Sequence, residues 1–271
     1  MKSSHDKAAK FLLSKWYLDC VSEEGSALIC YAASLRWRSL SLSYSSVLRR
    51  QADGRAETCT TLQEFAPPEV NCSSVRWLSQ GLKVEGKWDA VSQPVKQTLL
   101  ESADGKIEWN CLQPRSRAEV RFGTGSGLKG LGYVEHLTMT IAPWRLPFDE
   151  LRWGRFLSEE DALVWIGWSG AESFNLSFHN GTRIYNAAIA ENKFAAGAMS
   201  VSLFENSVLR EGALVKTALS MIPGINKLFP LRILQARECK WLSRGLLKQP
   251  DAEESRGWAI HEVVRWPKRN S

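Results

Sequence analysis

The sequence of 271 residues lacks most of the features that mark cofactor-dependent enzymes. It holds no phosphate-binding loop, no dinucleotide fingerprint and no nucleophile elbow, so the common nucleotide-dependent and serine-hydrolase sites are excluded. Its 4 histidines form no HxH or HExxH pair, and its 6 cysteines form no CxxC pair. We therefore expect no metal site and no cofactor.

Long apolar runs and clustered basic residues are also missing. No segment reaches the roughly 20 apolar residues of a membrane-spanning helix, and the run Phe11–Leu13 is too short for a signal peptide. The net charge of +6 comes from Lys and Arg scattered among acids, so we expect no nucleic-acid partner. Irregularly spaced cysteines without a secretory signal indicate free thiols and a cytoplasmic location.

Tryptophan is the residue type in excess, with 12 in the chain. Each one brings a large apolar surface and a single N–H group that needs a partner. Some will fill the core or cover strand edges. So many in one chain also predict an aromatic-lined cavity for an apolar ligand.

Short alternating segments separated by turn residues run along most of the chain. Asn180-Gly181 is a strong hairpin signal between Phe174–Phe178 and Arg183–Ala190. Short strands at regular spacing are typical of an all-β barrel or sandwich. Two segments, Ser207–Leu219 and Ile225–Ile233, are expected to be helical. The other expected strands lie in Trp16–Val47, Glu57–Glu64, Val75–Leu78, Leu82–Trp88, Val95–Glu101, Ile107–Leu112, Ala118–Phe122, Tyr133–Ile141, Arg152–Leu157, Ala162–Trp168, Ala195–Phe204 and Gly257–Trp266.

The beginning of the chain is echoed in its second half. Trp16–Tyr31 and Trp153–Ile166 both contain a Trp, a Ser-Glu-Glu turn and an Ala-Leu pair. Gly132–His136 resembles Gly257–His261 in its glycine, aromatic residue and histidine. Because the echoes keep their order at a spacing of roughly 130 residues, they predict an old internal duplication.

The boundary between the two copies is marked by proline. Pro143 and Pro147 interrupt the strand pattern, since proline lacks a backbone donor and restricts the residue before it. We therefore expect two all-β domains, at residues 1–146 and 147–271.

Four segments carry a family resemblance: Trp16–Asp19, Asp104–Trp109, Gly132–Glu135 and the junction Pro143–Arg155. They resemble the carotenoid hydratase (hydroxyneurosporene synthase)-like superfamily, which includes lipocalin-like Diels–Alderases. The resemblance implies two lipocalin-like antiparallel β-barrel domains with an apolar cavity. It also implies cofactor-free chemistry on polyenes or isoprenoids, without fixing the reaction.

Glu135 is the foremost candidate for catalysis. It lies in phase with Tyr133 and Leu137, so its carboxyl is expected on an apolar face, where it must be paired or protonated. One hypothesis is a buried ion pair with Arg152 or Arg155 that ties the two domains together. The other is a neutral carboxylic acid that protonates an alkene, since burial raises a carboxyl pKa.

Other residues complete the candidate site. Asp19 is a second acid, either catalytic in the first domain or simply at a strand end. Glu262 is the second copy's nearest counterpart of Glu135, whereas His136 and His261 are interpreted as structural. Arg152 can polarise a substrate carbonyl, and aromatic faces can stack on a polyene. The ligand-binding candidates are Trp16, Tyr17, Tyr133, Trp153, Arg155, Trp168, Trp258 and Glu262.

Two function classes remain open at this point. The first is a cofactor-free lyase or isomerase acting on a polyene or terpenoid by hydration, cyclisation or cycloaddition. The second is a non-catalytic carrier of an apolar ligand. The apolar segment Met221–Leu234 is either a packing helix on the barrel or an entrance that touches a membrane surface.

Overall fold

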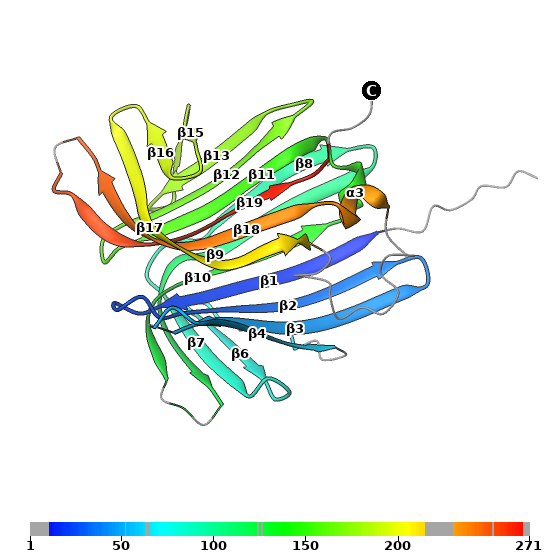
Figure 1. Ribbon diagram of the computed structural model, residues 1–271, viewed down its shortest axis with the longest axis horizontal. Coiled ribbons are helices and arrows are strands. Elements are labelled where there is room, and N and C mark those ends of the chain that lie inside the picture. The colour runs from blue at the N-terminus through cyan, green and yellow to red at the C-terminus, as the bar shows by residue number, and fades with distance from the viewer. Residues whose placement is uncertain are drawn as a thin grey trace, which may run out of the picture.

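The structure is a computed structural model that describes residues 11–51, 53–62, 66–123, 125, 127–214, 230–250 and 252–267. Two large antiparallel sheets, one from each half of the chain, lie one above the other (Figure 1). The turn η1 (Pro143–Arg145) connects them, and the short helix α3 (Leu231–Leu234) lies near that connection in Figure 1. No helix in these ranges is long and apolar enough to cross a membrane.

Sheet A is formed by the first half of the described chain. Its strands are β4 (Ala56–Leu62), β3 (Leu40–Arg50), β2 (Ala27–Trp37), β1 (Leu12–Val21), β10 (Leu128–Met139), β9 (Gly105–Phe122), β7 (Val84–Ala90), β6 (Ser74–Ser79) and β5 (Glu69–Val70), in spatial order. An additional strand, β8 (Val95–Ser102), pairs with β9. Alternation of apolar and polar residues places these strands with one face toward a core.

Sheet B is formed by the second half. Its order is β14 (Thr182–Ile184), β13 (Phe174–His179), β12 (Ala162–Gly170), β11 (Phe148–Leu157), β19 (Ser255–Arg265), β18 (Arg237–Lys248), β17 (Met199–Ala213), β16 (Lys193–Ala196) and β15 (Ala188–Ile189). In each sheet the first strand lies between the second strand and the last, β1 beside β10 and β11 beside β19. The two sheets therefore share the same central strand order.

The registers of these strand pairs define equivalent positions in the two sheets. Val21 faces Leu131 in sheet A, and Leu157 faces Trp258 in sheet B. On this match Gly130, rather than the expected Gly132, is the counterpart of Gly257. An added Cβ would lie 1.9 Å from the Val21 carbonyl oxygen at Gly130 and 2.0 Å from that of Leu157 at Gly257. Descent from a duplication stays a prediction.

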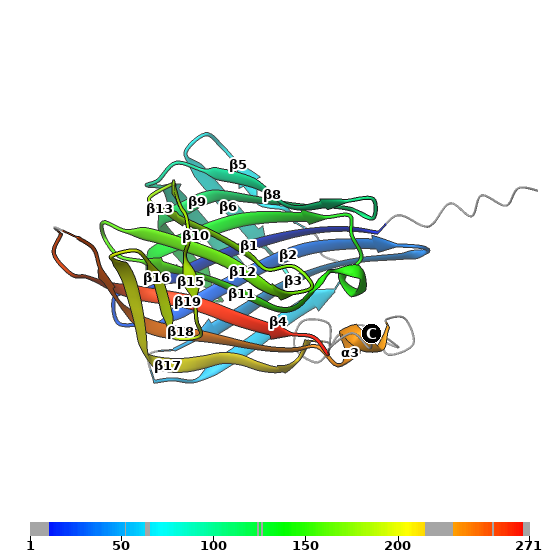
Figure 2. The same ribbon diagram turned by 90° about the horizontal axis from the view of Figure 1, so that it is seen from above.

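Three cores hold the structure together. Along β1, Leu18 and Cys20 face an outer core beneath the curled edge of sheet A, which also contains Trp88. Phe156 belongs to the matching outer core of sheet B. The alternate residues of β1 and β11, Tyr17 among them, face a central core between the sheets. Figure 2, seen from above, shows β11, β12 and β19 of sheet B overlapping the strands of sheet A in projection.

Most sequence expectations are confirmed. The protein is all-β, with two curled antiparallel sheets of the lipocalin-like kind and a few short helices. The hairpin at Asn180-Gly181 is present, with φ of 48° and 82° at the two turn residues. The six cysteines are free thiols.

Some element boundaries differ from the expectation. Residues Ser207–Ala213 are part of strand β17, not a helix, because they pair with β18 in an extended ladder. Ile107–Leu112 and Ala118–Phe122 join into the single long strand β9, which pairs with three neighbours. Long-range pairing outweighs local propensity in these cases. The expected helical residues between 215 and 229 lie outside the described ranges.

Candidate functional site

A buried ion pair joins the two sheets at their centre. Asp19 on β1 and Arg155 on β11 are both fully buried. The Arg155 Nη2 and Nε atoms donate to Asp19 Oδ1 and Oδ2 at 2.8 and 3.1 Å, and Tyr17 Oη donates to Oδ2 at 3.0 Å. Burial raises the pKa of Asp19, and the Arg155 charge opposes that shift. The pair is bidentate and fully desolvated, so it fixes how the sheets pack.

Glu135 on β10 lies beside this pair in a cage of aromatic donors. Its Oε2 atom accepts hydrogen bonds from Trp109 Nε1 at 2.6 Å, Tyr133 Oη at 2.6 Å and Trp153 Nε1 at 3.3 Å. Among the described residues, no cation lies within ion-pair distance of Glu135 and nothing hydrogen-bonds to Oε1. The side chain therefore has one fully occupied oxygen and one that is open.

The surroundings of Glu135 favour its neutral form. Burial raises the pKa of this carboxyl, and the hydrogen bonds from Tyr133 and Trp109 only partly oppose the shift. Because Oε2 already accepts three hydrogen bonds, a proton on the neutral acid resides on Oε1. When Glu135 is protonated, its acidic hydrogen would therefore lie on the oxygen that has no partner among the described residues.

Glu262 on β19 occupies the equivalent position in sheet B but has the opposite character. Its Oε2 lies 2.5 Å from Lys240 Nζ, and Lys240 is buried whereas Glu262 is partly buried. Burial alone would raise the pKa of Glu262, but the charges of Lys240, Lys15 and Arg210 and the hydrogen bond from Lys240 together lower it. The pKa values of two carboxyls at matching positions are therefore shifted in opposite directions, which is a common arrangement in acid–base sites.

Tyr31 on β2 lies between these groups and is 3% exposed. Its hydroxyl has no hydrogen-bond partner in the described part of the chain. Three cationic groups lie near its ring centroid: Lys15 Nζ at 5.2 Å, Arg210 Cζ at 5.5 Å and Lys240 Nζ at 6.0 Å. Cations at such distances are attracted by the aromatic face.

The two ends of the space between the sheets differ in polarity. At one end, a cavity of about 790 Å³ lies between the Ser22–Glu23 and Ser158–Glu159 turns and reaches Arg155. Charged side chains dominate its rim. At the opposite end, apolar side chains remain partly exposed around the central core, including Leu13, Leu40, Leu42, Leu137, Leu151, Ala213 and Leu234. We call this second end the apolar mouth.

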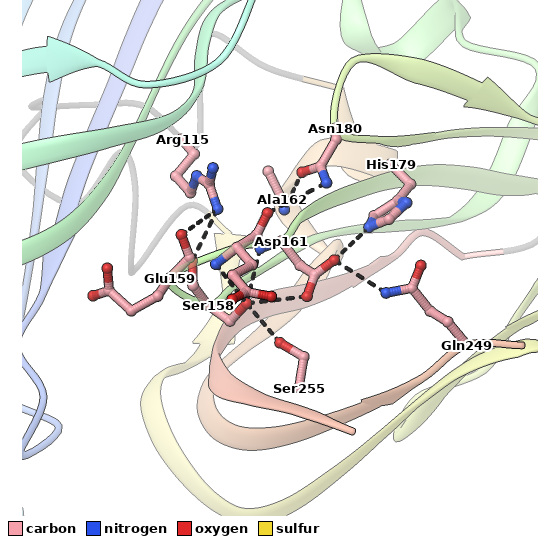
Figure 3. A network of polar contacts seen from close by, with 10 residues as sticks. Arg115, Ser158, Glu159, Asp161, Ala162, His179, Asn180, Gln249 and Ser255 are labelled. Atoms are coloured by element: carbon pink, nitrogen blue, oxygen red, sulfur yellow. Dashed lines mark hydrogen bonds and ion pairs between the residues drawn. The ribbon is translucent and has the colours of Figure 1, made fainter. Parts of the chain in front are cut away.

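The β11–β12 turn that borders the charged cavity is held by a polar network (Figure 3). Asp161 binds His179 Nε2 at 2.7 Å, and Ser158 Oγ accepts from the Asp161 backbone N–H. Arg115 of sheet A donates to the carbonyl oxygens of Ser158 and Glu159. His179 contacts no serine hydroxyl here, so the cluster is a turn clamp rather than a Ser–His–Asp triad.

Several predicted site residues meet at this centre. Tyr17, Tyr133 and Trp153 pack edge to face with ring centroids 5.0 to 5.9 Å apart. Asp19 and Arg155 border them at the charged end. Trp258 lines the charged cavity, donates to the Glu23 carbonyl oxygen at 3.2 Å and lies under the Arg244 guanidinium.

Other predicted residues lie away from the centre. Trp16 stacks on His136 on the opposite face of β1. Trp168 stacks between Phe148 and Phe174 toward the far end of β12. Arg152 pairs with Glu150 at 2.7 Å on the outer side of sheet B.

The expected ion pair of Glu135 with Arg152 or Arg155 is wrong. Arg152 lies on the opposite face of β11, because adjacent strand residues point to opposite faces. Arg155 faces the centre, but its guanidinium is taken by Asp19 and the Trp258 carbonyl oxygen. The placement of the Glu135 carboxyl on the buried face is confirmed.

Lys240, Arg210, Tyr31 and Trp109 are members of the centre that the sequence reasoning missed. Lys240 lies between Cys239 and Trp241 in a segment with no motif, and its burial depends on pairing with β19. Trp109 is the last residue of the Asp104–Trp109 segment that carries the family resemblance, which was a signal for its role. His261 is bonded to Ser243 Oγ at 2.8 Å, as expected of a structural histidine.

Comparison with known proteins identifies the fold. No family model and no curated protein sequence matches the chain. Kievitone hydratase from Nectria haematococca is similar in structure, with a TM-score of 0.54, 10% identity and coverage of 95% of this chain and 89% of that one. CghA is similar with a TM-score of 0.58, 9% identity and coverage of 96% and 90%. CghA with Sch210972 gives a TM-score of 0.55, 9% identity and the same coverage. The chain thus has the fold of these proteins, and its predicted resemblance to the hydratase and lipocalin-like superfamily is confirmed at the level of the fold.

Proposed function

We propose that the protein is a hydratase- or cyclase-type enzyme that acts without a cofactor on an apolar polyene or terpenoid. The observation that carries this proposal is the buried Glu135 carboxyl, whose pKa is raised by burial and whose Oε2 accepts three hydrogen bonds while Oε1 has no partner among the described residues. The apolar mouth supplies a surface for a hydrocarbon chain, and Glu135 lies on the same strand, β10, as Leu137 of that mouth. The fold shared with a named hydratase agrees with this chemistry.

The reaction begins with proton transfer from Glu135 Oε1 to an alkene carbon, which leaves a carbocation on the substrate. The resulting carboxylate is stabilised by Tyr133, Trp109 and Trp153, whose N–H and O–H groups already point at Oε2. The carboxylate that proton transfer leaves on Glu135 stabilises the cation. Attack by water gives a hydrated product and attack by a second alkene gives a ring. In both, a proton returns to Glu135 and no external oxidant or reductant is required.

The neighbouring ion pairs position the aromatic residues around Glu135 for this proton transfer. Asp19–Arg155 holds Tyr17 through the Asp19 carboxylate, and Tyr17 in turn packs on Tyr133 and Trp153. Lys240 is paired with Glu262, and the Lys15 charge only partly opposes the rise that burial causes in the pKa of Glu135. The raised pKa of Glu135 and the lowered pKa of Glu262 support general-acid catalysis by Glu135.

The test is turnover by Glu135→Gln, with Glu262→Gln and exposed Glu85→Gln as comparison variants. Substrate candidates come from mass spectrometry of molecules that copurify with the protein from its native host. Glu135→Gln should still bind the ligand but lose at least about a hundredfold in turnover, the usual effect of removing a general acid. A protein that binds the ligand and leaves it unchanged, with Glu135→Gln indistinguishable from wild type, is instead a carrier.

A further inference from the structure

The cluster around Tyr31 has a property that alkene protonation does not use. Its hydroxyl is buried and has no hydrogen-bond partner in the ranges described above. Leaving a buried hydroxyl unpaired is costly, and most such groups in folded proteins are satisfied. An orphan hydroxyl between two sheets, at the inner end of an apolar mouth, is therefore positioned to meet a ligand.

The charges around Tyr31 do not balance. Arg210 pairs with Glu238 at 2.6 Å, and Lys240 pairs with Glu262 at 2.5 Å. Lys15 is the third cation near the ring, and it forms no ion pair within the described residues. Lys15 is thus the cation of these three that has no paired carboxylate in the part of the chain that the structure describes.

We propose that this cluster binds an anionic oxygen at one end of the substrate, with the Tyr31 hydroxyl as hydrogen-bond donor and Lys15 as counter-charge. This inference rests on the proposed function, because it places the hydrocarbon body of the same substrate in the apolar mouth. A carboxylate is the simplest such group. An acceptor oxygen would satisfy the orphan donor, and its negative charge would balance the cluster.

The geometry also explains a difference among the three cations. Arg210 and Lys240 come from sheet B and are fixed by their own carboxylates, whereas Lys15 comes from β1 and lies toward the apolar mouth. Lys15 is only partly buried, so its ammonium can adjust to an incoming ligand. The anion would thus be held between the paired side chains of Arg210 and Lys240 on one side and the Lys15 ammonium on the other.

Binding of two matched polyenes tests the inference. Retinoate and retinol share one hydrocarbon chain and differ in the charge of the terminal group, and both can be titrated through quenching of tryptophan fluorescence. Wild type should bind retinoate about tenfold more tightly than retinol, the effect expected of one hydrogen bond to a charged group. Tyr31→Phe and Lys15→Met should each remove most of this preference by weakening retinoate binding while leaving retinol binding nearly unchanged.

Tyr185→Phe is the matched control, since Tyr185 is 67% exposed and its hydroxyl is remote from the cluster. This variant should keep the tenfold preference. Thermal melting checks the fold, and Tyr31→Phe should not lower the melting temperature because its hydroxyl has no protein partner to lose. Lys15→Met changes a partly exposed position, so its effect on the retinoate preference tests the inference independently of Tyr31→Phe.

Equal affinity of wild type for retinoate and retinol would overturn this inference and leave the proposed catalysis by Glu135 intact. An unchanged preference in both Tyr31→Phe and Lys15→Met would do the same. Loss of turnover in Glu135→Gln is a separate measurement, so the proposed function can fail or stand on its own result.

Discussion

Asp19 and Arg155 occupy equivalent positions in the two sheets and form a buried ion pair with each other. The strand registers match Asp19 to Arg155 and Tyr17 to Trp153, and each matched pair is also in contact, by an ion pair and by a ring contact at 5.0 Å. The two sheets therefore meet about an approximate twofold axis through the candidate site. Residues with the same place in the fold have opposite charges, which makes the interface specific for one packing.

The central ion pair should dominate the stability of the sheet interface. Asp19→Asn leaves Arg155 buried without a counter-charge, which should lower the free energy of unfolding by about 3–5 kcal/mol. The double variant Asp19→Asn, Arg155→Met should recover part of that loss. Glu159→Gln, which breaks an exposed pair with Arg117, should cost less than about 1 kcal/mol. Chemical denaturation measures all three, and equal losses at the buried and exposed pairs would contradict the assignment.

Substitution by glutamine should change the free energy of unfolding little at Glu135 and much more at Glu262. Glutamine resembles a neutral carboxylic acid, so Glu135→Gln should change the free energy of unfolding by only about 1 kcal/mol. Glu262→Gln removes the partner of buried Lys240 and should cost about 3–5 kcal/mol. Thermal and denaturant unfolding of both variants decide this before any substrate is known. A large loss in Glu135→Gln would mean that the carboxyl is ionised.

His261 should make the protein less stable in mild acid. Burial, together with Lys240, lowers the pKa of His261 to about 4 from its usual 6.5. A lowered pKa means that the fold favours the neutral ring, so the stabilisation is complete above pH 6.5 and is lost as pH falls toward 4. The loss should reach about 3 kcal/mol, from about 1.4 kcal/mol per pH unit.

The measurement is the unfolding free energy of wild type and His261→Gln across this pH range. Carboxyl groups titrate in both proteins, so the difference between the two curves isolates the histidine. His261→Gln should have the flatter curve between pH 6.5 and 4. Parallel curves would show that His261 carries the same pKa folded and unfolded.

Gly130 and Gly257 should tolerate no side chain. An added Cβ would lie within 2.0 Å of a carbonyl oxygen on the adjacent strand in each case, and relief would require β1 to separate from β10, or β11 from β19. Alanine at either position should cost about 1–3 kcal/mol or more. Gly125→Ala is the control, because its nearest atom lies at 3.6 Å. Melting temperatures report the difference, and similar values for all three variants would refute the close approach.

The sequence by itself determined the fold class and the strand face on which Glu135, the leading catalytic candidate, lies. Period-two alternation and turn residues are local signals, and they fixed the all-β character and most strand positions. The same alternation placed Glu135 on the buried face with Tyr133, which its hydrogen bond confirms. The echoed Ser-Glu-Glu turns pointed to the matching β1–β2 and β11–β12 hairpins.

Only the tertiary structure decided which charged groups meet. Arg155 and Asp19 are far apart in sequence, and their pairing depends on how two curled sheets stack, which no local pattern records. The same stacking gives Glu135 three aromatic donors in place of a cation and gives Glu262 the partner Lys240. Strand period sets the direction of a side chain, but its neighbour across a sheet interface depends on sheet twist and packing.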